Sequence, residues 1–191
     1  AGAQPADKET NNDCDSAGNG LILTDVVNDT AWVNIEKSSS VDDSIWVDEA
    51  ANAPTLAADK NKLYWKIVVT TPTTAEKPNQ MVIPTLQLTD NLPGVLNNGP
   101  FQTQVSITQR QILPAGNGSF SGCNAPALGA ATFHCDVKNV APGTRIELVL
   151  EVDRPLSSGR LTNTVEVASP DAVLSSLRAD GKYGDDAAVI V

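Results

Sequence analysis

The stretch KLYWKIVVTT, residues 62–71, decides the fold class. One face of this stretch, taken as an extended chain, carries the large apolar side chains Leu63, Trp65, Ile67 and Val69. Aromatic and β-branched residues, which favour strands, fill the rest of it. Seven other segments have strand character: 30–37, 81–90, 101–113, 132–140, 144–153, 161–169 and 186–191. Turn sequences rich in Gly, Pro and Asn separate them, so we predict an all-β antiparallel sandwich.

The only helical signal that we find lies in residues 169–177, SPDAVLSSL. Ser169 is a suitable N-cap and Pro170 suits the first helical position, so this segment predicts one turn of helix.

Composition limits the possible partners. The chain has 191 residues and a formal net charge of −10, with 41% hydrophobic but only 4% aromatic residues. This length suits one domain, and the core must consist mainly of Val, Ile, Leu and Ala. The acidic balance argues against nucleic acid and anionic membrane surfaces as partners, because both bind through Lys and Arg. No apolar run approaches the ~20 residues that a membrane-spanning helix needs.

The three cysteines suggest an oxidising compartment. A loop containing Gly and Pro separates Cys123 from Cys135, and we predict a disulfide bond between them worth about 3 kcal/mol. We prefer this bridge to two buried thiols in a cytosolic protein. Cys14 then remains for an intersubunit bridge, a free thiol, or exchange with the Cys123 loop. The first residues, AGAQPAD, are typical of a mature terminus, so we expect an extracellular, cell-surface location.

Four short motifs occur in order along most of the chain. They are Tyr64 in its strand, Asp-x-Leu-Pro at 90–93, Ala-Pro-Gly at 141–143, and Leu-Thr-Asn-Thr at 161–164. Together they resemble the conserved repeat domain of many bacterial and archaeal surface proteins, a family named mainly for its unknown function. The resemblance covers residues 31–191 and implies an immunoglobulin-like antiparallel β-sandwich outside the cell, with residues 1–30 as an N-terminal extension.

Residues 1–30 form a polar arm that contains one apolar stretch. The apolar residues of that stretch, which lie on both faces of an extended chain, are Leu21, Ile22, Leu23, Val26 and Val27. Such a strand needs cover on both sides. It could be a donor strand that completes the sheet of the next subunit, giving a head-to-tail filament. It could equally be an extra edge strand of its own domain.

Catalytic signals are weak. His134 stands next to Cys135 in a strand-like segment, where neighbouring side chains point to opposite faces and cannot act as a nucleophile pair. We find no zinc-ligand spacing and no distinguished pair of carboxylates. The sequence therefore predicts no enzyme.

The TAWVNIEK strand places Lys37 on the same face as Val33 and Ile35. Lys37 and Asn163 could in principle form an isopeptide crosslink with Glu166 as catalyst, as in some surface sandwiches. We prefer the alternative, in which Lys37 faces solvent and Asn163 merely belongs to the Leu-Thr-Asn-Thr motif.

Calcium is the most credible small ligand. Two acidic stretches supply the candidate ligands Asp42, Asp43, Asp180, Asp185 and Asp186. Carboxylates in irregular loops suit Ca²⁺, although such loops are more often simply solvated.

Asn28 and Asn117 each begin an Asn-x-Ser/Thr triplet, which is a glycosylation acceptor in a host with the machinery. The sequence as a whole predicts a structural subunit of an extracellular filament, pilus-like fibre or matrix. This subunit would polymerise with itself by strand donation. The alternative is a monomeric surface adhesion or carbohydrate-binding module.

Overall fold

The computed structural model describes residues 30–48, 50–92, 104–155, 158–178 and 180–191. The described part contains ten strands and no α-helix. The elements are β1 (Thr30–Ser40), the 3₁₀ turn η1 (Ala50–Asn52), β2 (Lys62–Thr70), β3 (Ile83–Asn91), β4 (Val105–Leu113), β5 (Ser119–Ser121), β6 (Thr132–Val140), β7 (Arg145–Asp153), β8 (Arg160–Ala168), β9 (Val173–Ser176) and β10 (Gly184–Ile190). The prediction of an all-β, immunoglobulin-like sandwich is confirmed.

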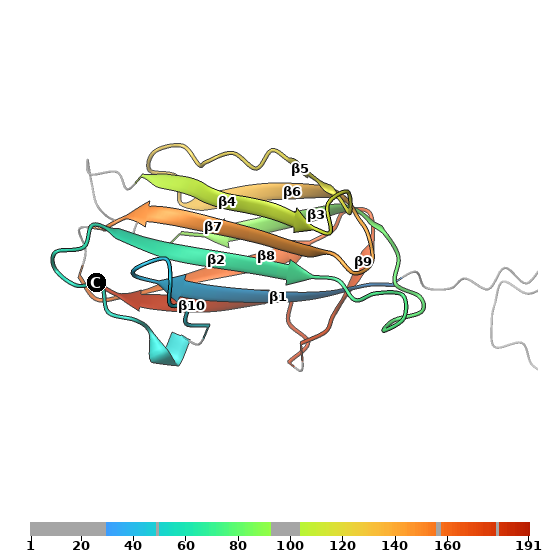
Figure 1. The fold of residues 1–191 in the computed structure, drawn as a ribbon, viewed down its shortest axis with the longest axis horizontal. Coiled ribbons are helices and arrows are strands. Elements are labelled where there is room, and N and C mark those ends of the chain that lie inside the picture. Colours follow the sequence, from blue (N-terminus) through green and yellow to red (C-terminus); the bar gives the residue numbers. More distant parts are fainter. Residues whose placement is uncertain (1–29, 49, 93–103, 156–157, 179) are drawn as a thin grey trace, which may run out of the picture.

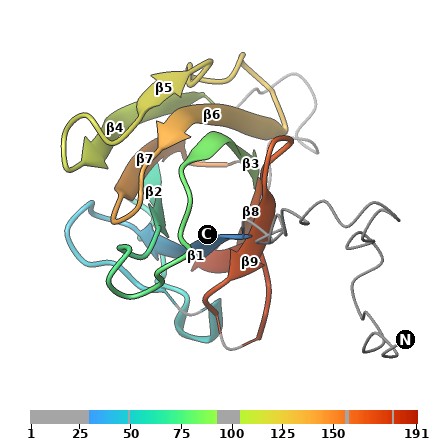
Figure 2. The same cartoon turned by 90° about the vertical axis from the view of Figure 1, so that its right-hand side faces the viewer.

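The strands form two five-stranded sheets that face each other (Figure 1). One sheet has the order β4-β7-β2-β1-β9 and the other has the order β10-β8-β3-β6-β5. All neighbouring strands run antiparallel except β1 and β9, which are parallel. Viewed end on, the two sheets surround a common interior (Figure 2). Strand β1 of one sheet lies close to β10 of the other (Figure 1).

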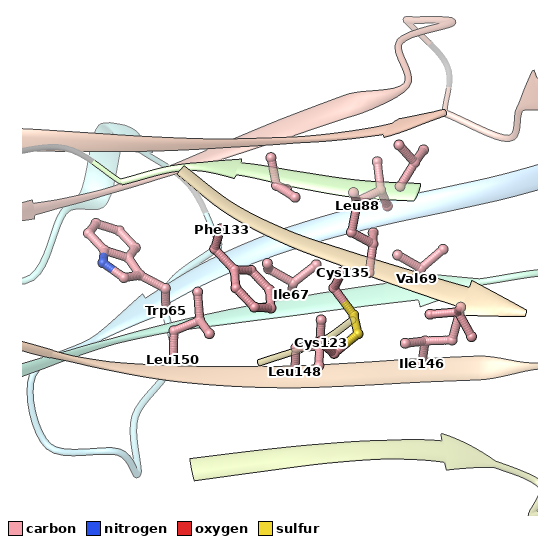
Figure 3. Close-up of a cluster of buried hydrophobic side chains, with 14 of the residues drawn as sticks. Trp65, Ile67, Val69, Leu88, Cys123, Phe133, Cys135, Ile146, Leu148 and Leu150 are labelled. Atoms are coloured by element: carbon pink, nitrogen blue, oxygen red, sulfur yellow. A yellow bond between two sulfur atoms is a disulfide. The ribbon is translucent and has the colours of Figure 1, made fainter. Parts of the chain in front are cut away.

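Along each strand, inward-facing residues alternate with outward-facing ones, and the inward-facing residues of both sheets form the core. On β2 the face predicted from the sequence is buried, and Trp65 is 1% exposed. Figure 3 shows Trp65, Phe133 and the Cys123–Cys135 disulfide bond among the aliphatic side chains of this core. The disulfide bond attaches the loop after β5 to β6, and both of its cysteines are buried.

All eight segments predicted as strands are strands in the structure. The predicted helical turn at 169–177 is wrong, because Val173–Ser176 is strand β9, which pairs with the first residues of β1. The Ser169 hydroxyl does accept a hydrogen bond from the Asp171 N–H at 3.3 Å, but this bond closes a bend that precedes a strand. Tertiary pairing thus overrides the local helical signal.

None of the described helices is long and apolar enough to cross a membrane.

Candidate functional site

The interior contains a lysine. Lys37 follows Val33 and Ile35 on the inward face of β1, and its whole side chain is buried. Lysine is almost never fully buried unless its amine is paired. A partner for the amine is therefore expected within the core.

That group is Asp90 of β3, in the opposite sheet. Its carboxylate Oδ2 lies 2.7 Å from Lys37 Nζ, and both side chains are 0% exposed. Asp90 reaches the interior because it continues the inward alternation of Leu86 and Leu88 along β3. The two sheets are thus joined across the core by one ion pair.

Asn163 of β8 completes what we call the Lys37–Asp90–Asn163 cluster. Asp90 lies opposite Val165 in the β3–β8 register, so Asn163 is two residues away on the same inward face. Asn163 is also fully buried. Within the described chain, neither polar atom of its side chain has a hydrogen-bond partner, and the same is true of Asp90 Oδ1.

Burial favours the uncharged forms of both Lys37 and Asp90. It lowers the pKa of the Lys37 amine, although Asp90 and, more weakly, Asp185 act in the opposite direction. Burial also raises the pKa of Asp90, against the opposing effects of Lys37 and the neighbouring Asn163 amide. The Asn163 amide does not reach hydrogen-bond geometry. The pair is therefore driven toward a free amine beside a protonated carboxyl group.

Aromatic side chains line the cluster. Lys37 Nζ lies 5.9 Å from the ring centroid of Trp65, and Phe133 stands opposite Asp90 in the β3–β6 register. Both aromatic residues are 1% exposed. An apolar lining of this kind keeps water out and strengthens the electrostatic interactions within the cluster.

If its role were only structural, the cluster would lower the stability of the fold. A buried ion pair recovers its desolvation cost only when the remaining polar atoms are also satisfied, and here three are not. Each unsatisfied buried group costs about 1–3 kcal/mol. Reactive groups are commonly kept in such strained polar surroundings.

The three groups are those needed to form an amide between side chains. The free Lys37 amine can attack Asn163 Cγ, while the Asp90 carboxyl group donates a proton to Oδ1 of the developing tetrahedral intermediate. The attack forms the Cγ–Nζ bond. Collapse of the intermediate returns the Oδ1 proton to Asp90, re-forms the carbonyl group and breaks the Cγ–Nδ2 bond. Asp90 carries the proton lost by Nζ to the leaving nitrogen, which departs as ammonia. The step needs no oxidant, reductant or cofactor.

This arrangement corrects two sequence-based predictions. Lys37 does not face solvent, because it points inward from β1 and pairs with Asp90. Glu166 is exposed on the outer face of β8 and does not belong to the cluster; the carboxyl group present is that of Asp90. The Asp-x-Leu-Pro motif contains Asp90 without indicating a site, but the alternation of Asp90 with Leu86 and Leu88 indicates its inward position.

The predicted Cys123–Cys135 disulfide bond is confirmed. His134 is exposed whereas Cys135 is buried in the core, so the two point to opposite faces as predicted. The His134 ring Nδ1 lies 3.2 Å from the Thr89 hydroxyl on the neighbouring strand.

The candidate calcium ligands have other partners. In the described part of the chain, no group of three or more His, Cys, Asp or Glu side chains is placed to hold a metal ion. Asp42 accepts hydrogen bonds from the main-chain N–H groups of its own loop, and Asp180 and Asp185 both pair with Arg178. Asp43 and Asp186 are exposed. Calcium binding stays a prediction.

Several predicted residues lie outside the described ranges: Cys14, the donor-strand residues Leu21, Ile22, Leu23, Val26 and Val27, and Asn28. Asn117 is described, in the turn before β5, where its main-chain oxygen accepts a hydrogen bond from the Ala141 N–H at 3.0 Å. Its glycosylation stays a prediction.

No protein-family model matches the chain, and neither does any curated protein sequence. Solved structures similar to it include the C-terminal domain of the Streptococcus agalactiae AgI/II polypeptide BspA (TM-score 0.47, 9% identity, 82% of this chain and 49% of that one). The C-terminal domain of the Streptococcus pyogenes antigen I/II-family protein AspA gives 0.46 and 10%, with 83% and 46% covered. Domains D2 and D3 of the Corynebacterium diphtheriae major pilin SpaD give 0.43 and 14%, with 81% and 49% covered. The chain spans about half the length of these structures.

Proposed function

We propose that this chain is a structural domain of a cell-surface protein, and that a covalent bond between Lys37 and Asn163 joins its two sheets. The observation that carries the proposal is the fully buried Lys37–Asp90 pair beside an Asn163 side chain without hydrogen-bond partners. Amide formation would remove an ionisable amine from the core together with the asparagine amide nitrogen. It would thereby relieve the main cost of burying the cluster.

The surface location has separate support. The Cys123–Cys135 disulfide bond suits an oxidising compartment. The net charge of −10 favours solubility and disfavours binding to nucleic acid. A domain exposed outside the cell cannot rely on chaperones, so a permanent crosslink would preserve its fold.

Intact-mass measurement of the full chain tests the crosslink directly. We expect a deficit of one ammonia relative to the sequence mass, and a branched peptide that joins the segments around Lys37 and Asn163 after digestion. Lys37→Arg keeps a cation near Asp90 but removes the primary amine, so this variant should show the full mass. Lys66→Arg is the matched control on the outer face of β2, and it should keep the deficit.

Assembly into a filament is the finer form of the proposal. We propose that the segment from Leu21 to Val27 donates a strand to a neighbouring subunit, with Cys14 available for an intersubunit bridge. Negative-stain electron microscopy of the intact chain beside a deletion of residues 1–30, under non-reducing conditions, tests this. Filaments from the intact chain alone would support assembly. Single particles from both would favour a monomeric adhesion or carbohydrate-binding module.

A further inference from the structure

The edge of β1 beside Lys37 is closed in an unusual way. Alternate residues of β1 direct their main-chain groups away from β2, toward the free side of the strand. At Val33 the carbonyl accepts a hydrogen bond from the Leu177 N–H at 2.8 Å, where the β9 pairing ends. At Ser39 both main-chain groups bond to Val47. Between these points, no strand of the described residues continues the sheet.

Two charged side chains fill this gap. The Arg178 guanidinium donates to the Ile35 carbonyl at 3.0 Å, and Asp185 Oδ2 accepts from the Lys37 main-chain N–H at 2.6 Å. Arg178 Nη1 and Asp185 Oδ1 form an ion pair at 2.9 Å. Arg178 follows β9 of one sheet and Asp185 belongs to β10 of the other, so the pair also connects the two sheets.

The pair is held in place. The side chain of Asp185 is 14% exposed and that of Arg178 is 26% exposed. Each carries out two tasks, because each bonds both its partner and the β1 main chain. Shielded, charge-assisted hydrogen bonds of this kind are stronger and more directional than exposed neutral ones.

We propose that Asp185, fixed by Arg178, is a positioning residue for the reaction of Lys37 with Asn163. It holds the main chain of β1 at Lys37, and thereby sets where the amine meets Asp90 and the amide carbon. This inference rests on the proposed function. It extends that function by naming residues that never touch the reacting atoms.

The physical reason is that the rate of the reaction depends steeply on the geometry of the attack. Attack requires Nζ and Cγ within about 3–3.5 Å in the correct direction, and a displacement of about 1 Å costs on the order of 100-fold in rate. Lys37 has four rotatable side-chain bonds, so the position of its main chain is the first constraint on Nζ. The charged groups that face Lys37 are Asp90 from β3 and Asp185 from β10, and Arg178 neutralises the second.

The test measures the rate of ammonia loss. The full chain is made by cell-free synthesis under oxidising conditions, translation is stopped, and intact mass is followed with time. We expect Asp185→Ala to slow the loss by about tenfold or more. Asp185→Asn should recover most of the rate, since its Oδ1 can still accept the Lys37 N–H. Asp186→Asn, an exposed neighbour on β10, is the charge-matched control and should react like the unchanged chain.

Arg178 supplies a second measurement in case Asp185→Ala fails to fold. Arg178→Met should slow the reaction, and Arg178→Lys should restore part of the rate by renewing the ion pair with Asp185. Equal rates for Asp185→Ala, Arg178→Met and Asp186→Asn would overturn the positioning role while leaving the crosslink intact. A full mass for the unchanged chain at all times would overturn the crosslink and the positioning role together.

Discussion

Asn163→Ala isolates the energetic contribution of the proposed crosslink. The side chain has no hydrogen-bond partner in the described structure, so its truncation breaks no hydrogen bond and removes an unsatisfied amide. Truncation of Lys37 or Asp90 would instead leave a buried charge alone. The variant therefore differs from the unchanged chain mainly in lacking the covalent bond.

The size of the effect follows from the loop that the bond closes. Lys37 and Asn163 are separated by roughly 125 residues, and the chain-entropy treatment of crosslinks gives about 5 kcal/mol for a loop of that length. For a domain of this size, 1 kcal/mol corresponds to about 2–4 °C in melting temperature. We therefore expect Asn163→Ala to melt about 10–20 °C below the unchanged chain.

Thermal unfolding of oxidised samples, with intact mass recorded on each, is the assay. Asn91→Ala, the same substitution at an exposed position of β3, loses only an exposed hydrogen bond to the Thr164 hydroxyl, so it should change stability by no more than about 1 kcal/mol. The reasoning is refuted if the unchanged chain lacks the ammonia deficit. It is also refuted if the deficit is present but Asn163→Ala melts with the unchanged chain.

Three further predictions concern Asp90, the disulfide bond and Asp42. Asp90→Ala should abolish the mass deficit and lower the free energy of unfolding by about 3–5 kcal/mol beyond the loss of the crosslink, because Lys37 stays buried without its carboxylate; urea unfolding measures this. Replacing both Cys123 and Cys135 by Ala should cost about 3 kcal/mol, and an identical urea midpoint for the oxidised and reduced chain would contradict that value. Hydrogen bonds from main-chain N–H groups of its loop hold the pKa of Asp42 below its ordinary value. The stabilising contribution of Asp42 should be complete above its ordinary pKa and should be lost as the pH falls through the lower pKa of the folded state. In acid titrations followed by NMR, Asp42→Ala should abolish this pH dependence.

Alternation along single strands was sufficient to predict most of the architecture. The same alternation placed Lys37 with Val33 and Ile35, which is its true face. A lone charge on a core face is improbable without a partner, so the sequence favours a solvent-facing lysine, which the structure shows to be wrong. Its partner is more than fifty residues further along the chain and in the other sheet, and no local pattern reports which strands face each other.

The incorrect choice of Glu166 could have been avoided. Asn163, Val165 and Val167 alternate inward along β8, so a residue between them points outward. Strand β9, where the sequence predicts a helical turn, has a different explanation. Its parallel pairing with β1 depends on the position of the first strand, so a signal within residues 169–177 could not reveal it.

The proposed crosslink between Lys37 and Asn163 would have a mechanical consequence, because of where the two residues lie along the chain. Lys37 lies in the first strand and Asn163 in β8, which pairs with the last strand. Tension applied before β1 and after β10 would pass directly from one residue to the other through the covalent bond. The intervening length, on the order of 400 Å when extended, would then bear no load. Such a domain could lose its tertiary packing under force and still lengthen very little, behaving as an inextensible link.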